Sequence, residues 1–216
     1  MHLLRKILLS LFLVAIIAFS GANGNAATDD KRIAKARTVL VVGDSLSAAY
    51  GIDARSGWVS LLQKRLASLD TRYTVINASI TGDTTAGGRN RMPNLLKTYK
   101  PSIVIIELGA NDGLRGLPLD QMKQNIAKMI RMAQQSGVKV VLAGVRIPPN
   151  YGPQYTQGFR QNFESLAKQH KTVFIPFLLK DVAENPRLMQ DDNYHPNEQA
   201  QVVILENVWV QLEQLL

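Results

Sequence analysis

Apolar residues gather in five short runs along the chain. The runs cover residues 38–42, 73–77, 103–108, 138–145 and 173–177. Each run is dense in Val, Ile or Leu rather than alternating with polar residues, which is typical of strands covered on both faces. The pattern therefore predicts five buried strands.

Helical spacing of apolar residues fills segments between these runs. It extends over 58–69 and over 122–133, with Gly137 as a stop signal. The last segment opens at His195-Pro196, with proline at the favoured first helical position, and stays apolar at helical spacing to Leu216. Alternating strands and helices predict right-handed crossovers and an α/β fold with a doubly wound parallel sheet.

Polar residues follow the predicted strands at one edge of this sheet. In open parallel sheets the ligand site lies beyond the carboxyl ends of the strands. These positions are residues 43–45, 78–83, 109–112 and 146–151, together with Asp192 and His195 before the last helix. We expect them to face one crevice.

A serine nucleophile needs a base to accept its proton, usually a histidine oriented by a carboxylate. Ser45 follows the first strand, although Gly, Asp and Ser are also ordinary turn residues. His170 stands among charged neighbours at a predicted helix end, where a surface role is expected. His195 follows Asp191 and Asp192 by four and three residues, so either carboxylate is a candidate partner, and a helix-capping role for this histidine is the alternative.

Acyl transfer also needs donors for the oxyanion of the tetrahedral intermediate. The candidates are the backbone N–H of Ser45, the backbone N–H of Gly82 and the side-chain amide of Asn111. A turn glycine and a loop-capping amide are the structural alternatives for Gly82 and Asn111.

The start of the chain differs from the rest. Basic residues up to Lys6 precede a mainly apolar run of thirteen residues over 7–19, and small or polar residues follow to Ala26. This order is typical of an export signal, whereas a run of thirteen residues is short for a membrane anchor, which is the alternative. We therefore expect a signal peptide over 1–26, a flexible lead-in over 27–37, and a single domain over 38–216 that is periplasmic or secreted.

Composition narrows the chemistry and the partners. The chain has no cysteine, which excludes disulfides, cysteine nucleophiles and thiolate metal sites. The formal net charge of +8 falls to +6 when Arg5 and Lys6 leave with the signal, and the basic residues are scattered among acids. We expect no nucleic-acid partner and no obligate protein partner, while transient contact with membrane lipids fits this charge.

Four ordered blocks resemble a known family. GDSLS at 43–47, NASITGDT at 77–84, ELGANDGLRG at 107–116 and DDNYHPN at 191–197 are similar to the four motif blocks of the SGNH (GDSL) hydrolases. The resemblance is close to the bacterial periplasmic branch called arylesterase, thioesterase I, protease I or lysophospholipase L1, and includes the RIPPNYGPQY loop at 146–155. It implies a three-layer α/β/α sandwich with a mostly parallel five-stranded sheet.

The resemblance also implies roles for individual residues. Ser45 is the implied nucleophile, His195 the base, and Asp192, rather than Asp191 or Asp44, the orienting acid. Asp44 is expected to hydrogen-bond the turn that presents Ser45.

The same resemblance implies an oxyanion hole formed by Ser45, Gly82 and Asn111, and a mobile loop over 113–118. No cofactor and no metal are expected. Candidate residues for the walls of an acyl crevice are Leu114, Leu117, Ile147, Pro148 and Tyr151.

These features predict a serine esterase or thioesterase that cleaves acyl esters of small molecules, including aryl esters and lysophospholipids, through an acyl-enzyme. Alternatives are a carbohydrate O-acetyl esterase, a non-catalytic lipid-binding module on the same fold, and a receiver-like domain with Asp44 as phospho-acceptor. Metal-assisted hydrolysis would instead draw its ligands from Asp83, Asp112, Asp191, Asp192 and His195.

Overall fold

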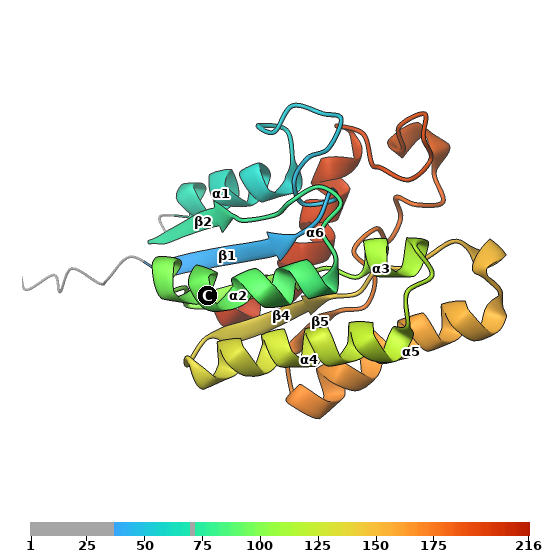
Figure 1. The fold of residues 1–216 in the computed structure, drawn as a ribbon. Helices are drawn as coiled ribbons and strands as arrows, with labels where there is room; N and C mark the ends of the chain where they lie inside the picture. Colours follow the sequence, from blue (N-terminus) through green and yellow to red (C-terminus); the bar gives the residue numbers. More distant parts are fainter. Residues whose placement is uncertain (1–36, 70–71) are drawn as a thin grey trace, which may run out of the picture. The chain divides into compact units, whose positions relative to one another are not determined.

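One parallel sheet forms the centre of the part of the chain that the computed structural model describes, residues 37–69 and 72–216. Its strand order is β2-β1-β3-β4-β5 (Figure 1). The strands are β1 (Arg37–Gly43), β2 (Tyr73–Asn77), β3 (Ile103–Glu107), β4 (Lys139–Ala143) and β5 (Val173–Ile175). The prediction of a five-stranded parallel sheet is confirmed, with strand ends shifted by one or two residues.

Helices cover both faces of this sheet (Figure 1). Helices α1 and α6 contact each other on one face, while α2, α4 and α5 form a row of contacting neighbours on the other. The α-helices are α1 (Trp58–Ser68), α2 (Thr85–Tyr99), α3 (Ala110–Leu114), α4 (Leu119–Gln135), α5 (Pro153–His170) and α6 (Ala200–Leu212). Short 3-10 helices are η1 (Pro149–Tyr151), η2 (Pro186–Leu188) and η3 (Glu213–Leu215). The three-layer α/β/α architecture is therefore confirmed.

The predicted start of the last helix is wrong by four residues. Pro196 does not open α6 but forms an isolated antiparallel bridge with Met189. The helix begins at Ala200, whose N–H donates to the side-chain oxygen of Asn197 at 3.2 Å. Because Pro196 lies in the bridge with Met189, the preference of proline for a first helical turn does not set the start of α6.

Helix α2 has no counterpart among the helices that the apolar spacing predicts. It contains Gly87, Gly88 and Pro93, which weaken the helical signal. Its start is fixed by Thr84, whose side chain accepts a hydrogen bond from Gly87 N. A Cβ at Gly88 would lie 2.2 Å from Leu108 Cδ1, so the glycine lets α2 approach the end of β3 closely.

The central strands carry the hydrophobic core. The side chains of Val39 to Val42 in β1 and of Ile103 to Ile106 in β3 are fully buried. In the β1–β3 register Gly43 stands beside Glu107, so the ends of these strands are aligned. The sheet thus presents the residues after β1 and β3 at a common edge.

The signal peptide expected over 1–26 and the lead-in up to residue 36 lie outside the described residues. Arg37, expected to end the lead-in, is the first residue of β1. Among the described residues, no helix has the length and apolar character needed to cross a membrane.

Candidate active site

Ser45 lies in the turn directly after β1 and is 9% exposed. The turn is closed by backbone hydrogen bonds from Ala48 N to Asp44 O and from Tyr50 N to Ser45 O. These bonds fix the backbone on both sides of the serine. The hydroxyl faces a cavity that His195 also lines.

The three groups proposed from the sequence as a triad form one hydrogen-bonded line. Ser45 Oγ lies 3.0 Å from His195 Nε2, and His195 Nδ1 lies 2.6 Å from Asp192 Oδ2. The ring of Tyr50 packs against the imidazole, with centroids 4.5 Å apart. This geometry allows His195 to accept a proton from Ser45 while Asp192 holds the other ring nitrogen.

The tight loop before His195 orients Asp192. Its second oxygen, Oδ1, accepts from the backbone N–H groups of Tyr194 and His195, each at 2.9 Å. Burial alone would raise the pKa of Asp192, but the hydrogen bonds from His195 and Tyr194 lower it to about 2. The loop therefore brings an ionised Asp192, and not Asp191, to the ring. His170 ends α5 just before β5 starts, at the opposite edge of the sheet.

Two of the candidate oxyanion donors are without an acceptor among the described residues, whereas the third is already hydrogen-bonded. Among the described residues, the backbone N–H groups of Ser45 and Gly82 donate no hydrogen bond. Gly82 has a φ of +77°, a left-handed conformation that favours glycine. Asn111 Nδ2 donates to Asp83 O at 3.0 Å and to Asp44 Oδ2 at 3.2 Å, so both amide hydrogens are engaged.

Asp44 supports the nucleophile turn rather than the imidazole. Its Oδ1 accepts from Leu46 N at 3.1 Å and its Oδ2 from Asn111. Burial raises the pKa of Asp44 to about 6, although the hydrogen bonds from Leu46 and Asn111 and the nearby His195 oppose this rise. The carboxyl group thus joins the nucleophile turn to the start of α3.

Glu107 is a buried acid whose role the sequence interpretation did not assign. Its Oε2 accepts from Ser47 Oγ at 2.6 Å and from Asp44 N at 3.4 Å. Both partners flank Ser45. A charged residue that ends an otherwise apolar strand, directly before a candidate site, was the signal that could have identified it.

A cavity of about 660 Å³ opens beside Ser45 and His195. Leu114, Ile147, Pro148 and Tyr151 line it, in the positions expected from the sequence. Leu117 does not line it. The sequence interpretation missed a further wall, which comes from the segment after β5: Phe177, Leu179, Ala183, Glu184 and Met189.

The carboxylates considered for a metal site do not gather. Asp83 pairs with Arg91 at 2.8 Å, and Asp112 accepts from the backbone and hydroxyl of Thr85 at 2.8 and 2.5 Å. In the described part of the chain, no cluster of three or more His, Asp or Glu side chains could hold a metal ion. The proposed ligand set therefore does not form a shared site.

Comparison with known proteins gives concordant similarities. The model of the GDSL-like Lipase/Acylhydrolase family matches residues 41–203. Esterase TesA of Pseudomonas aeruginosa is 52% identical over 183 residues, which cover 85% of this chain and 91% of the relative. Thioesterase 1/protease 1/lysophospholipase L1 of Escherichia coli K12 is 39% identical over 185 residues, covering 86% and 88%.

The crystal structure of TesA superposes with a TM-score of 0.82 at 52% identity, covering 83% of this chain and all of that one. The resemblance inferred from the four sequence blocks is thereby confirmed.

Proposed function

Because this chain belongs to the GDSL-like lipase/acylhydrolase family and is an ester hydrolase, we propose that Ser45, His195 and Asp192 carry out its reaction on acyl esters and thioesters. The observation that supports this assignment is the line from Ser45 Oγ through His195 to Asp192, with contacts of 3.0 and 2.6 Å. No other described histidine lies at this edge of the sheet.

The reaction proceeds in two displacement steps. Ser45 Oγ attacks the carbonyl carbon, and its proton passes to His195 Nε2. The tetrahedral intermediate collapses as the alcohol or thiol leaves with that proton, so the acyl group stays on Ser45. Water then attacks the acyl-enzyme, again losing a proton to His195, and the acid is released as Ser45 recovers its proton. Asp192 stabilises the imidazolium that forms in each step.

The oxyanion is bound by the N–H groups of Ser45 and Gly82 and by Asn111. The two backbone donors have no other acceptor among the described residues. The contact of Asn111 Nδ2 with Asp44 Oδ2, at 3.2 Å, is the longer of its two hydrogen bonds. The oxyanion replaces Asp44 as the acceptor of this hydrogen, while the bond to Asp83 O is kept. Preorganised donors of this kind contribute a large part of the rate acceleration in acyl transfer.

The acyl chain occupies the cavity beside Ser45. Its lining by Leu114, Ile147, Pro148 and Tyr151 is mainly apolar, which suits a hydrocarbon chain better than a sugar. The enzyme acts after export to the periplasm or the medium, as the signal-like segment over 1–26 indicates.

Hydrolysis of p-nitrophenyl esters by the mature protein tests this function. Wild-type enzyme should release p-nitrophenol and become covalently labelled on Ser45 by a fluorophosphonate. Ser45→Ala should lower kcat by about a millionfold, while Ser68→Ala, on the exposed side of α1, should match the wild type. Full activity in folded Ser45→Ala, or labelling of another residue, would refute the assignment.

A further inference from the structure

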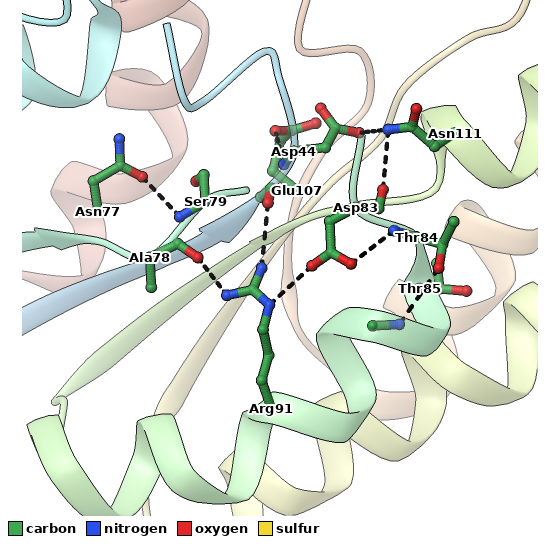
Figure 2. Close-up of polar contacts among 12 residues, drawn as sticks. Asp44, Asn77, Ala78, Ser79, Asp83, Thr84, Thr85, Arg91, Glu107 and Asn111 are labelled. Carbon is green, nitrogen blue, oxygen red and sulfur yellow. Dashed lines mark hydrogen bonds and ion pairs between the residues drawn. The ribbon is translucent and has the colours of Figure 1, made fainter. Parts of the chain in front are cut away.

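Arg91 extends from α2 back to the ends of two strands (Figure 2). Its Nη2 donates to Gly43 O at 3.3 Å, and its Nη1 donates to Ala78 O. Its Nε donates to the carboxylate of Asp83 at 2.8 Å. One guanidinium group therefore joins the end of β1, the residue after β2 and the loop that precedes α2.

Each of these segments leads to an oxyanion donor. Gly43 precedes Ser45 by two residues, and Asp83 directly follows Gly82. The carbonyl oxygen of Asp83 accepts from Asn111 Nδ2 at 3.0 Å, which links the third donor to the same network (Figure 2). The three donors lie in the connections that follow β1, β2 and β3. Arg91 bonds directly to residues at the first two of these connections and is linked to the third through Asp83, which accepts from Asn111.

The network is well sheltered and closely packed. The side chains of Arg91 and Asp83 are 19% and 11% exposed. The other oxygen of the Asp83 carboxylate accepts from Thr84 N at 2.9 Å. A Cβ at Gly87 would lie 1.9 Å from that oxygen, so the glycine lets the first turn of α2 pack directly on Asp83. The carboxylate that receives Arg91 is thus itself fixed.

The planar fork of arginine suits this arrangement. Three N–H groups point in different directions in one plane, so a single side chain reaches two carbonyl oxygens and a carboxylate. Charge-assisted hydrogen bonds of this kind are stronger than neutral ones. A lysine would present a point charge on a flexible stem and could not hold all three acceptors in one geometry.

We propose that Arg91 is a positioning residue that sets the spacing of the oxyanion donors Ser45 N–H, Gly82 N–H and Asn111 Nδ2. The proposal rests on the function proposed for Ser45. Arg91 does not touch substrate, and acts only through Gly43, Ala78 and Asp83. Because misplacement of reacting groups by about 1 Å can cost about a hundredfold in rate, loss of Arg91 should affect the transition state more than substrate binding.

Kinetics of Arg91→Met, Arg91→Lys and the control Lys97→Met test this role. Lys97 is an exposed residue in the last turn of the same helix. The active fraction of each preparation is titrated to completion with a fluorophosphonate, so that kcat refers to folded sites only. Arg91→Met should lower kcat per site by about 10- to 100-fold with KM changed less than threefold. Arg91→Lys should fall between Arg91→Met and wild type, and Lys97→Met should equal wild type.

Affinity for an alkyl boronic acid, which forms a tetrahedral adduct with the serine, gives the second readout. The affinity for the boronic acid should weaken in Arg91→Met roughly in parallel with kcat, whereas the affinity for the fatty acid product should equal that of the wild type. A purely structural role would instead reduce the titratable fraction and leave kcat per site and boronate affinity unchanged, which would overturn the proposal.

If Arg91→Met and Arg91→Lys do not fold, Asp83→Asn is measured in the same way. It removes the negative charge that faces Arg91 and replaces one of the two acceptor oxygens by an NH2 group, but keeps the backbone carbonyl that binds Asn111. Wild-type values for this variant would also overturn the proposal. Failure of the proposed function would appear separately, as an inactive wild type or an active Ser45→Ala.

Discussion

Close packing around Glu107 explains two residues of the GDSLS block that take no part in proton transfer. A Cβ at Gly43 would lie 2.7 Å from Glu107 Oε2 and 2.8 Å from Ser47 Oγ, so the first position must be glycine. Ser47 in turn donates to Glu107 at 2.6 Å. Burial, and then the neighbouring charge of Asp44, raise the pKa of Glu107 well above its usual value. The folded chain therefore holds the proton of Glu107 more tightly than the unfolded chain does.

The raised pKa of Glu107 has a consequence for stability that Glu107→Gln should reveal. Above the ordinary pKa of 4.5 the unfolded chain releases this proton more readily than the folded chain does, so wild-type stability falls as pH rises. Glutamine has no such proton. Between pH 5 and pH 7 the free energy of unfolding of the variant should rise relative to wild type, by at most about 1.4 kcal/mol per pH unit, as measured by urea unfolding at both pH values.

The control for this experiment is Glu164→Gln on α5, a residue whose side chain is 52% exposed. It should keep the pH dependence of the wild type. Parallel stability curves for wild type and Glu107→Gln would show that folding does not raise the pKa of Glu107, contrary to the expectation.

At the level of elements, two tyrosines hold the connection between α3 and α4. Tyr151 Oη donates to Leu114 O at 2.7 Å, and Tyr155 Oη donates to Leu117 O at 2.8 Å. From the same connection Arg115 Nη2 donates to Gly82 O at 3.0 Å. The loop expected over 113–118 is thus hydrogen-bonded to η1, to α5 and to the candidate oxyanion turn.

Limited trypsin digestion measures how firmly the tyrosines hold this connection. Tyr151→Phe and Tyr155→Phe each remove a hydrogen bond worth about 1 kcal/mol, so each should speed cleavage after the exposed Arg115 about fivefold. Peptides that end at Arg115 are quantified by mass spectrometry over time. Tyr99→Phe, an exposed residue of α2, is the control. Equal cleavage rates in all four proteins would show that the hydroxyl groups do not restrain the loop.

The success of the sequence predictions differed between elements for a physical reason. Strands such as Ile103–Glu107 are buried on both faces, and continuous burial leaves an unmistakable apolar run. Helix α2 leaves a weak signal because Gly87 and Gly88 serve close packing instead of helix propensity. The start of α6 was misplaced because Pro196 is used in a bridge with Met189, a pairing that the helix preferences of single residues do not reveal.

At the level of the whole molecule, the parallel sheet explains why the site could be located from sequence at all. Residues that follow Gly43 and Glu107 must meet at one edge, because parallel strands share their carboxyl ends. Side chains that reach the site from outside the strand ends could not be predicted in this way. Arg91 reaches the site from a helix, and Ala183 reaches the cavity from beyond β5, so neither stands at a strand end that the topology would single out.

The cavity extends across the sheet rather than along a strand. Ser45 follows β1, while Phe177 and Ala183 follow β5, three strand positions away in the order β1-β3-β4-β5. At about 4.8 Å per strand spacing this amounts to about 14 Å. A long acyl chain on the proposed nucleophile Ser45 would therefore run along the strand ends toward the segment after β5, whereas a short one would stay near the proposed triad.

Blocking the β5 side of the cavity should consequently separate long from short substrates. Ala183 is exposed and lines the cavity, so Ala183→Trp places a bulky ring in the path of the chain without disturbing the core. Each methylene kept out of an apolar site costs about 0.8 kcal/mol, so exclusion of two or three should lower kcat/KM for p-nitrophenyl dodecanoate about 15- to 60-fold. The value for p-nitrophenyl acetate should stay within twofold of wild type. Ala67→Trp, on the exposed face of α1, should change neither, and an equal loss on both esters in Ala183→Trp would mean that acyl chains do not take this path.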